Sequence, residues 1–162
     1  MWGRKAKVML PAGEEAPAFE LKKLEGGKQS LTEILKGGPA LFAFYKVSCP
    51  VCQLTAPYLE RLAAGANIQI IGVSQDDDAP TQAFNQRFGV TFPTLMDAAK
   101  DGYPASNAYG ISSVPSLFLV EKDGRVSKSF NGFSKRDMEE VGERAGIAPF
   151  RQGENVPEWK AG

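Results

Sequence analysis

The hydrophobic pattern of the first hundred residues alternates between two mostly apolar runs and two amphipathic segments. The runs "PALFAFYKV" (39–47) and "NIQIIGVSQ" (67–75) have the length of strands, and their composition is typical of strands buried on both faces of a parallel sheet. The segments that follow them, 49–65 and 80–89, carry apolar residues at helical spacing and end in glycine. This pattern predicts strand, helix, strand and helix in that order.

The second half of the chain predicts a hairpin and a closing helix. The strands "SLFLV" (116–120) and "RVSKSF" (125–130) flank the turn "EKDG". Pro115 directly precedes the first of them, where its missing N–H removes no ladder hydrogen bond. A helix is expected from the capping residue Ser134 to Gly146. Together these elements predict an α/β fold, a central mixed β-sheet flanked by helices.

Composition and charge fit one globular domain over residues 1–162. The chain is 43% hydrophobic and 23% charged, and 19 basic residues balance 19 acidic ones. A balanced charge gives no reason to expect nucleic acid as a partner, and no apolar run approaches the ~20 residues of a membrane span. The start, "MWGRKAKVMLPAGEEAP", lacks the apolar core of a secretory signal. We therefore expect a cytoplasmic protein, or an exported one if the sequence is a trimmed form.

The two cysteines of the chain, Cys49 and Cys52, lie where the predicted strand 39–47 ends and the following helix begins. Pro50 occupies the first helical position, where its missing N–H costs nothing. The first turn of a helix offers unpaired N–H groups and the positive end of the macrodipole, and both favour a thiolate on Cys49. Cys52 lies one turn further and is expected to resolve a mixed disulfide.

Other uses of two thiols are less favourable. The chain has no histidine, so it has no Cys/His dyad, and two cysteines alone do not complete a four-ligand zinc site. A structural disulfide across two residues closes a very small loop and constrains the unfolded chain little. The acidic run Asp76–Asp78 is interpreted as the cap and first turn of a helix rather than as a metal site. We therefore expect no cofactor, no metal and a redox-active dithiol.

The sequence resembles the thioredoxin-like superfamily, and within it the TlpA-like and AhpC/TSA (redoxin) branch, over about residues 10–146. The resemblance rests on "SCPVC" at the strand–helix junction, on Pro57 eight residues after Cys49, and on Val114–Pro115 before the hairpin. In addition, "AFELKKLEGGKQSLTEIL" (18–35) is similar to the N-terminal β-hairpin of that branch.

The resemblance implies a thioredoxin-like fold and thiol–disulfide exchange with a partner protein. The catalytic residues that the resemblance implies are Cys49 and Cys52. In the family the proline equivalent to Pro115 follows a cis peptide bond and lies against the cysteines, and the residue before it, here Val114, offers backbone hydrogen bonds to the bound partner. The residues adjoining Cys49 complete the expected substrate-binding set: Ser48, Pro50 and Val51. The partners implied are a disulfide-containing or dithiol protein and an electron donor.

Three positions depart from the family pattern. Ser48 stands where tryptophan is usual, Ala43 where thioredoxins bury an aspartate, and Thr55 where TlpA-like reductases often have glutamate. The last two departures remove the usual proton acceptors for Cys52. The sequence therefore leaves the route of the Cys52 proton open.

Two alternative functions are compatible with parts of this pattern. A thiol peroxidase needs Pro-x-x-x-Thr/Ser-x-x-Cys, but Phe42 and Lys46 occupy the proline and threonine positions before Cys49. A Cu(I)-binding chaperone is chemically allowed by two thiolates, although copper-delivery relatives add a histidine. We rank thiol–disulfide exchange first and copper binding last.

The tail "IAPFRQGENVPEWKAG" (147–162) shows no periodicity and is expected to be irregular. Its aromatic residues Phe150 and Trp159 are candidates to dock on the domain or on a second subunit. The sequence leaves that choice and the oligomeric state open.

Overall fold

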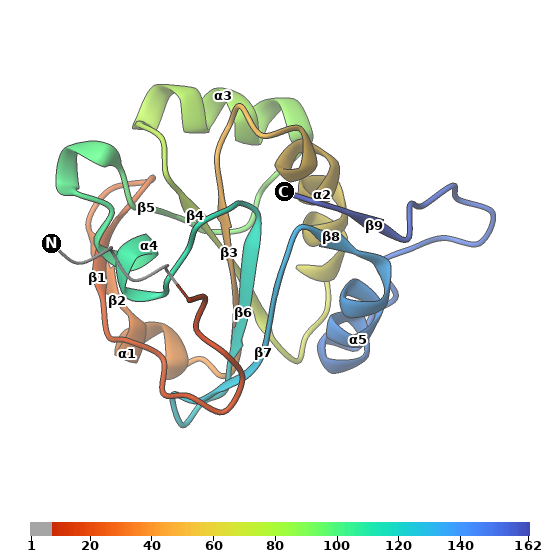
Figure 1. Ribbon diagram of the computed structural model, residues 1–162, viewed down its shortest axis with the longest axis horizontal. Coiled ribbons are helices and arrows are strands. Elements are labelled where there is room, and N and C mark those ends of the chain that lie inside the picture. The colour runs from red at the N-terminus through yellow and green to blue at the C-terminus, as the bar shows by residue number, and fades with distance from the viewer. Residues whose placement is uncertain (1–7) are drawn as a thin grey trace, which may run out of the picture.

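A seven-stranded mixed sheet forms the centre of the molecule, and helices pack on both of its sides (Figure 1). The structure is a computed structural model that describes residues 8–162. The strands are β1 (Glu20–Lys23), β2 (Lys28–Ser30), β3 (Ala40–Tyr45), β4 (Gln69–Ser74), β5 (Thr94–Met96), β6 (Ser116–Val120), β7 (Val126–Asn131), β8 (Phe133–Ser134) and β9 (Trp159–Lys160). The helices are α1 (Leu31–Leu35), α2 (Pro50–Leu62), α3 (Asp78–Phe88), the short 3-10 helix η1 (Ala99–Asp101), α4 (Pro104–Ala108) and α5 (Lys135–Ala145).

The sheet has the order β2-β1-β5-β4-β3-β6-β7. Strand β4 pairs in parallel with β3 and with β5. All other pairings in the sheet, β3 with β6, β6 with β7, β5 with β1 and β1 with β2, are antiparallel. The predicted mixed sheet is therefore confirmed. The expected N-terminal hairpin is β1 with β2, and its strand β1 extends the sheet by pairing with β5.

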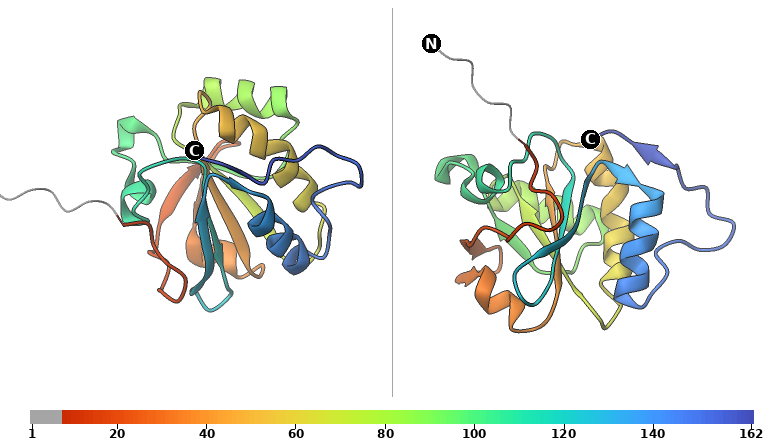
Figure 2. Two further views of the ribbon diagram at one scale, coloured as in Figure 1. Left: turned by 45° about the vertical axis from the view of Figure 1, so that its right-hand side comes forward. Right: turned by 60° about the horizontal axis from the view of Figure 1, so that its bottom comes forward.

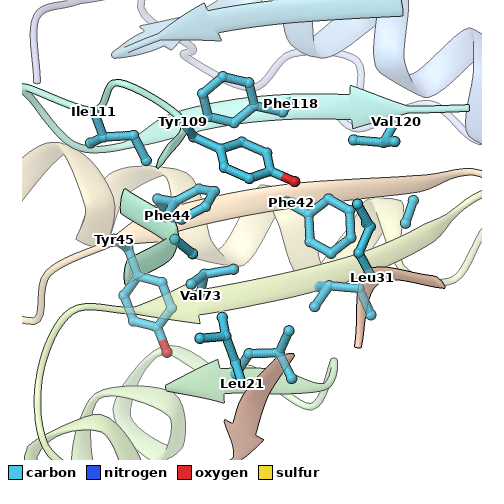
Figure 3. Packing of buried hydrophobic residues seen from close by; sticks show 14 of the residues in the cluster. Leu21, Leu31, Phe42, Phe44, Tyr45, Val73, Tyr109, Ile111, Phe118 and Val120 are labelled. Atoms are coloured by element: carbon cyan, nitrogen blue, oxygen red, sulfur yellow. The ribbon is translucent and has the colours of Figure 1, made fainter. Parts of the chain in front are cut away.

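Strand β3 is buried along its whole length, as its apolar run predicts. Its alternate residues serve two different core layers, because successive side chains point to opposite faces of a strand. Phe42 and Phe44 lie in the layer with Tyr109 and Phe118 (Figure 3), and the rings of Phe44 and Phe118 meet edge to face with centroids 5.7 Å apart. Truncating one such buried ring to alanine typically costs about 3–5 kcal/mol.

Helices α2 and α5 lie on the other side of the sheet from α1 and α4 (Figure 2). Leu41 and Ala43 of β3 belong to this second layer, together with Leu62 of α2 and Val141 of α5. The layer fixes α2 against the sheet. Since Cys49 directly precedes α2, this packing also determines where the cysteine lies.

Two sequence-based expectations concern the ends of the chain. The expectation that the start of the chain lacks a secretory signal concerns residues 1–7 in part, and these residues lie outside the described part of the chain. Within residues 8–162, no helix is both long enough and apolar enough to cross a bilayer. The tail, expected to be irregular, includes the strand β9, which pairs antiparallel with β8. Two residues are too few to leave a strand periodicity in the sequence, which is why the pattern did not reveal β9.

Candidate active site

Cys49 is the N-cap residue of α2. It has an extended backbone (φ −84°, ψ 114°), and its Sγ accepts a hydrogen bond from the backbone N–H of Cys52 at 3.1 Å. Pro50 is the first residue of the helix, as the sequence predicts. The thiol thus takes the position that a serine or aspartate side chain usually takes at a helix start, where unpaired N–H groups favour negative charge.

The loop between β3 and Cys49 is held by two polar side chains. The Asp76 carboxylate accepts a hydrogen bond from the backbone N–H of Val47 at 2.8 Å, and the Gln53 amide donates to the Val47 carbonyl at 3.0 Å. Sequence reasoning missed both contacts and assigned Asp76 to the start of the following helix. That helix begins at Asp78, and Asp76 supports the cysteine loop instead.

Cys52 is buried beneath Cys49, with only 2% of its surface exposed. Burial raises the pKa of its thiol, and the interaction of that thiol with the Cys49 side chain raises it further. Both cysteines are free thiols in this structure, so it represents the dithiol form. The half-buried Cys49 is the sulfur that a partner can reach, and Cys52 is placed behind it.

Among the described residues, none that lines the small cavity beside Cys52 carries a carboxylate. Ala43 and Thr55 both line this cavity, at the two positions where relatives of the thioredoxin type carry acids. The Thr55 hydroxyl donates to the Val51 carbonyl within α2 at 2.6 Å, so the helix backbone already uses it. The departure seen in the sequence is therefore a real difference in the chemistry around Cys52.

The segment before β6 lies against Cys49. The Val114–Pro115 peptide bond is cis, as the family resemblance implies. The Cys49 thiol lies within hydrogen-bonding distance of the Val114 carbonyl oxygen, at 3.4 Å, and the Pro115 carbonyl accepts from the N–H of Gly132 at 2.9 Å. The structure thus brings together four of the sequence-based site residues: Cys49, Cys52, Val114 and Pro115.

The other three expected site residues adjoin Cys49 along the chain. Ser48 and Pro50 are exposed, and Val51 is half-buried. Among residues 8–162, no group of three or more His, Cys, Asp or Glu side chains is arranged to hold a metal ion.

A polar cavity of about 170 Å³ opens beside Val114, and the sequence analysis did not anticipate it. Lys46, Gln75 and Ser106 contribute to its lining. Behind it the buried Asp97 carboxylate accepts hydrogen bonds from the backbone N–H groups of Ala105 and Ser106 and from the Ser106 hydroxyl. The Gln75 amide donates to the same hydroxyl at 2.8 Å. This network fixes the start of α4 next to the active site.

Known proteins share both the sequence and the fold. Residues 12–129 match the AhpC/TSA family. The thiol-disulfide oxidoreductase ResA of Geobacillus thermodenitrificans is 31% identical over 140 residues, which cover 83% of this chain and 78% of that protein. ResA of Halalkalibacterium halodurans is 32% identical over 138 residues, covering 83% and 76%.

Among solved structures, the thioredoxin domain of a thiol-disulfide oxidoreductase from Bacteroides vulgatus superposes with a TM-score of 0.72 at 23% identity. The superposition covers 83% of this chain and 97% of that one. This likeness establishes the thioredoxin-like fold independently of the sequence match. The family match, the two ResA relatives and the shared fold agree, and the chain belongs to the AhpC/TSA family, among its thiol–disulfide oxidoreductases.

Proposed function

We propose that Cys49 and Cys52 carry out the thiol–disulfide exchange of this oxidoreductase, with Cys49 as the attacking and Cys52 as the resolving thiol. The observation that carries the proposal is the difference in burial between two sulfurs that share one hydrogen-bonded turn. Cys49 is half-buried at the helix N-cap, whereas Cys52 is 2% exposed behind it. A partner disulfide can meet the first sulfur and not the second.

Reduction of a partner then follows in two balanced steps. The Cys49 thiolate attacks one sulfur of the partner disulfide, the partner S–S bond breaks, and the second partner sulfur leaves as a thiolate and takes up a proton. Cys52 then loses its proton and attacks Cys49 Sγ. The mixed disulfide breaks, a Cys49–Cys52 disulfide forms, and the partner has gained two electrons and two protons in total. A dithiol donor returns the pair to the reduced form, and the reverse sequence oxidises a partner.

The Cys52 proton leaves without help from a neighbouring carboxylate. Burial in apolar surroundings keeps this thiol protonated, and Thr55 offers no base because its hydroxyl is bonded to Val51. The proton acceptors that remain are solvent hydroxide and the thiolate that the partner releases in the first step. Resolution should therefore be slower than attack at neutral pH.

The partner is a protein that carries a disulfide or a dithiol, and its backbone is proposed to lie along Val114 and Pro115. The distance of 3.4 Å between Cys49 Sγ and the Val114 carbonyl supports this, because a chain bonded to Cys49 comes within reach of that carbonyl. Ser48, Pro50 and Val51 would contact the same chain from the other side of the sulfur.

A cytoplasmic site of action, expected from the sequence, remains part of the proposal. In a reducing compartment the pair is kept mainly as thiols. Trapping free thiols by alkylation in intact cells tests this directly. A mainly reduced pair agrees with the cytoplasm, and a mainly oxidised pair would indicate an exported protein.

The peroxidase alternative is less supported than disulfide exchange. The position where peroxiredoxins place a proline is Phe42, which is completely buried in the core. The position of their threonine is the exposed Lys46, which provides no hydroxyl. Neither side chain can bind a peroxide beside Cys49 as the peroxiredoxin motif does.

Trapping the mixed disulfide tests the assignment of the two cysteines. Cys52→Ser, incubated with a disulfide-bonded test protein such as insulin, should accumulate a covalent adduct that dithiothreitol releases. Cys49→Ser is the matched control and should form none. An adduct through Cys52, or no adduct with either variant, would reject the assignment. The wild-type pair should also titrate reversibly against glutathione between about −120 and −270 mV.

A further inference from the structure

The end of the chain lies on the surface to which the partner backbone has just been assigned. Gly162 packs so closely on Val114 that a methyl group on its Cα would lie 2.1 Å from the Val114 carbonyl oxygen and 3.3 Å from Pro115 Cδ. The same segment passes over Gly132, where a methyl group would lie 2.4 Å from the Lys160 carbonyl oxygen. Figures 1 and 2 show this end of the chain beside α2.

The last residues are held by a short piece of sheet. Strand β9 pairs with β8, so that Trp159 lies opposite Ser134 and Lys160 opposite Phe133. The N–H of Lys135 also donates to the Glu158 carbonyl at 3.0 Å. An isolated two-residue pairing stabilises little by itself. Trp159 adds little burial, since 59% of its surface is exposed.

The preceding part of the tail is held more strongly, and it is held to α2. The Arg61 guanidinium binds both carboxylate oxygens of Glu154 at 2.7 Å and also donates to the Pro149 carbonyl at 3.0 Å. The Phe150 ring packs edge to face on Tyr58 with centroids 5.0 Å apart. Residues 149–154 therefore form an anchor, and residues 158–162 form a weakly held end that reaches the active site.

From these contacts we propose that residues 158–162 are a displaceable cover on the partner-docking surface, which is formed by Val114, Pro115 and the edge of β8. This inference rests on the proposed function, which gives the Val114 backbone to the partner. A partner strand and Gly162 cannot both lie against the Val114 carbonyl, because the contact leaves no room for even a methyl group. The partner that fits is an extended segment that replaces β9 along β8, as in other cases of strand addition.

The cover lowers the apparent affinity for a partner in proportion to the time it spends closed. Only the open fraction binds, so the apparent dissociation constant rises by the inverse of that fraction. A small reagent that needs only Cys49 Sγ does not have to displace a strand. The cover should therefore slow protein disulfides selectively and leave small electrophiles nearly unaffected.

Two variants remove the cover in different ways. A chain that ends at Pro157 lacks residues 158–162 but keeps the Arg61–Glu154 anchor. Gly162→Ala keeps the length and adds the methyl group that collides with the Val114 carbonyl. Ala161→Ser is the matched control, because Ala161 is exposed, whereas the close approach to the Val114 carbonyl is made by Gly162. The readouts are the second-order rate constant for insulin reduction by the pre-reduced protein and the rate of Cys49 alkylation by iodoacetamide.

Shortening the chain should raise the insulin rate constant at least fivefold, and Gly162→Ala should change it in the same direction. Alkylation should change less than twofold, and Ala161→Ser should match the wild type in both assays. An unchanged or lower insulin rate in both variants would contradict the proposal that residues 158–162 cover the docking surface. A lower rate would mean that these residues contribute to binding the partner. If the wild-type protein forms no reversible Cys49–Cys52 disulfide with dithiothreitol, the proposed function fails and the inference fails with it.

Discussion

The Cys49 thiol lies 3.4 Å from the carbonyl oxygen of Val114, although 65 positions separate the two residues in the chain. The contact connects the chemistry of the sulfur with the binding of a partner. As a thiol, Cys49 can donate to this carbonyl. Once Cys49 is bonded to a partner sulfur it has no proton to donate, and in the proposed function the carbonyl then accepts from the partner's backbone N–H.

The burial of Cys52 should make the stability of the reduced protein depend on pH. Burial raises the pKa of this thiol, so the native state keeps a proton that the unfolded chain releases above about pH 8.5. The contribution is fully present below that pH and is lost progressively as the pH rises above it. Between pH 7.5 and pH 10 the reduced wild type should lose about 2 kcal/mol more stability than Cys52→Ala.

Urea unfolding under a strong reductant at both pH values measures this difference. The buried hydroxyls of Tyr45 and Tyr109 also have pKa values raised by burial, but they are present in both proteins and cancel in the comparison. Equal losses in the two proteins would show that Cys52 titrates alike in the folded and unfolded states.

The Asp97 carboxylate should be a main support of the start of α4, where Ser106 lines the cavity beside Val114. It is completely buried and accepts from the N–H groups of Ala105 and Ser106 and from the Ser106 hydroxyl. Asp97→Asn keeps the size but turns one acceptor into a donor that faces another donor. We expect a loss of about 2–4 kcal/mol in unfolding free energy, because hydrogen bonds to a buried charge are lost.

Ser106→Ala provides a milder comparison for Asp97→Asn. It removes only the hydroxyl, which bonds Asp97 and accepts from Gln75, so about 1 kcal/mol should be lost. Denaturant unfolding of the reduced proteins compares the two variants. Equal effects of both substitutions would mean that the negative charge of Asp97 contributes nothing beyond its bond to Ser106.

Local pattern was sufficient to predict most of the sheet and the helices around it. Strand β3 and helix α2 follow from an apolar run and a helical spacing, and both signals lie within a dozen residues of sequence. The position of the cysteines at their junction follows as well. The cis bond before Pro115 and its place against Cys49 came from the family resemblance, because no periodicity encodes a contact between residues far apart in the chain.

The polar contacts could not be predicted in the same way. Asp76 lies beside two other aspartates in sequence, and only the folded chain shows that it accepts from Val47 while Asp78 pairs with Lys22 at 2.8 Å. The contacts of the tail could not be predicted either, since it is held by the ion pair of Arg61 and Glu154, by the Phe150 ring on Tyr58 and by a strand of two residues. Such contacts depend on where side chains meet after folding.

Thr55→Glu should restore a proton acceptor for Cys52. Thr55 is 1% exposed and lines the cavity beside the Cys52 sulfur, so a carboxylate placed there lies near the buried thiol. A positioned general base typically contributes 10²–10⁴-fold, and a partly adapted site should give about tenfold or more in the resolving step. Burying the carboxyl should also lower stability by about 1–3 kcal/mol.

Thr55→Gln is the matched control for this change. It has nearly the same size and loses the same hydrogen bond to Val51, but it provides no base. Rapid-mixing experiments that follow the decay of the mixed disulfide at pH 7 separate the two variants. If both resolve at the same rate, the proton of Cys52 does not limit the resolving step.

The ion pair between Arg61 and Glu154 should control how firmly the tail is held. The Arg61 guanidinium holds the pKa of the Glu154 carboxyl down to about 2, and the N–H of Arg151 donates to the same carboxylate at 2.8 Å. A lowered pKa means that this carboxylate stabilises the docked tail above about pH 4.5, and that the effect is lost as the pH falls through about 2. Glu154→Gln removes the charge at neutral pH and should loosen the tail.

Hydrogen exchange of the Lys135 amide measures this loosening, because its N–H is bonded to the Glu158 carbonyl. Exchange at Lys135 should be several-fold faster in Glu154→Gln than in the wild type, whereas amides of β3 should be unchanged. Raising the salt concentration should accelerate Lys135 in the wild type more than in the variant, since a partly exposed ion pair is screened by salt. Equal exchange in both proteins would mean that Phe150 and β9 hold the tail without the ion pair.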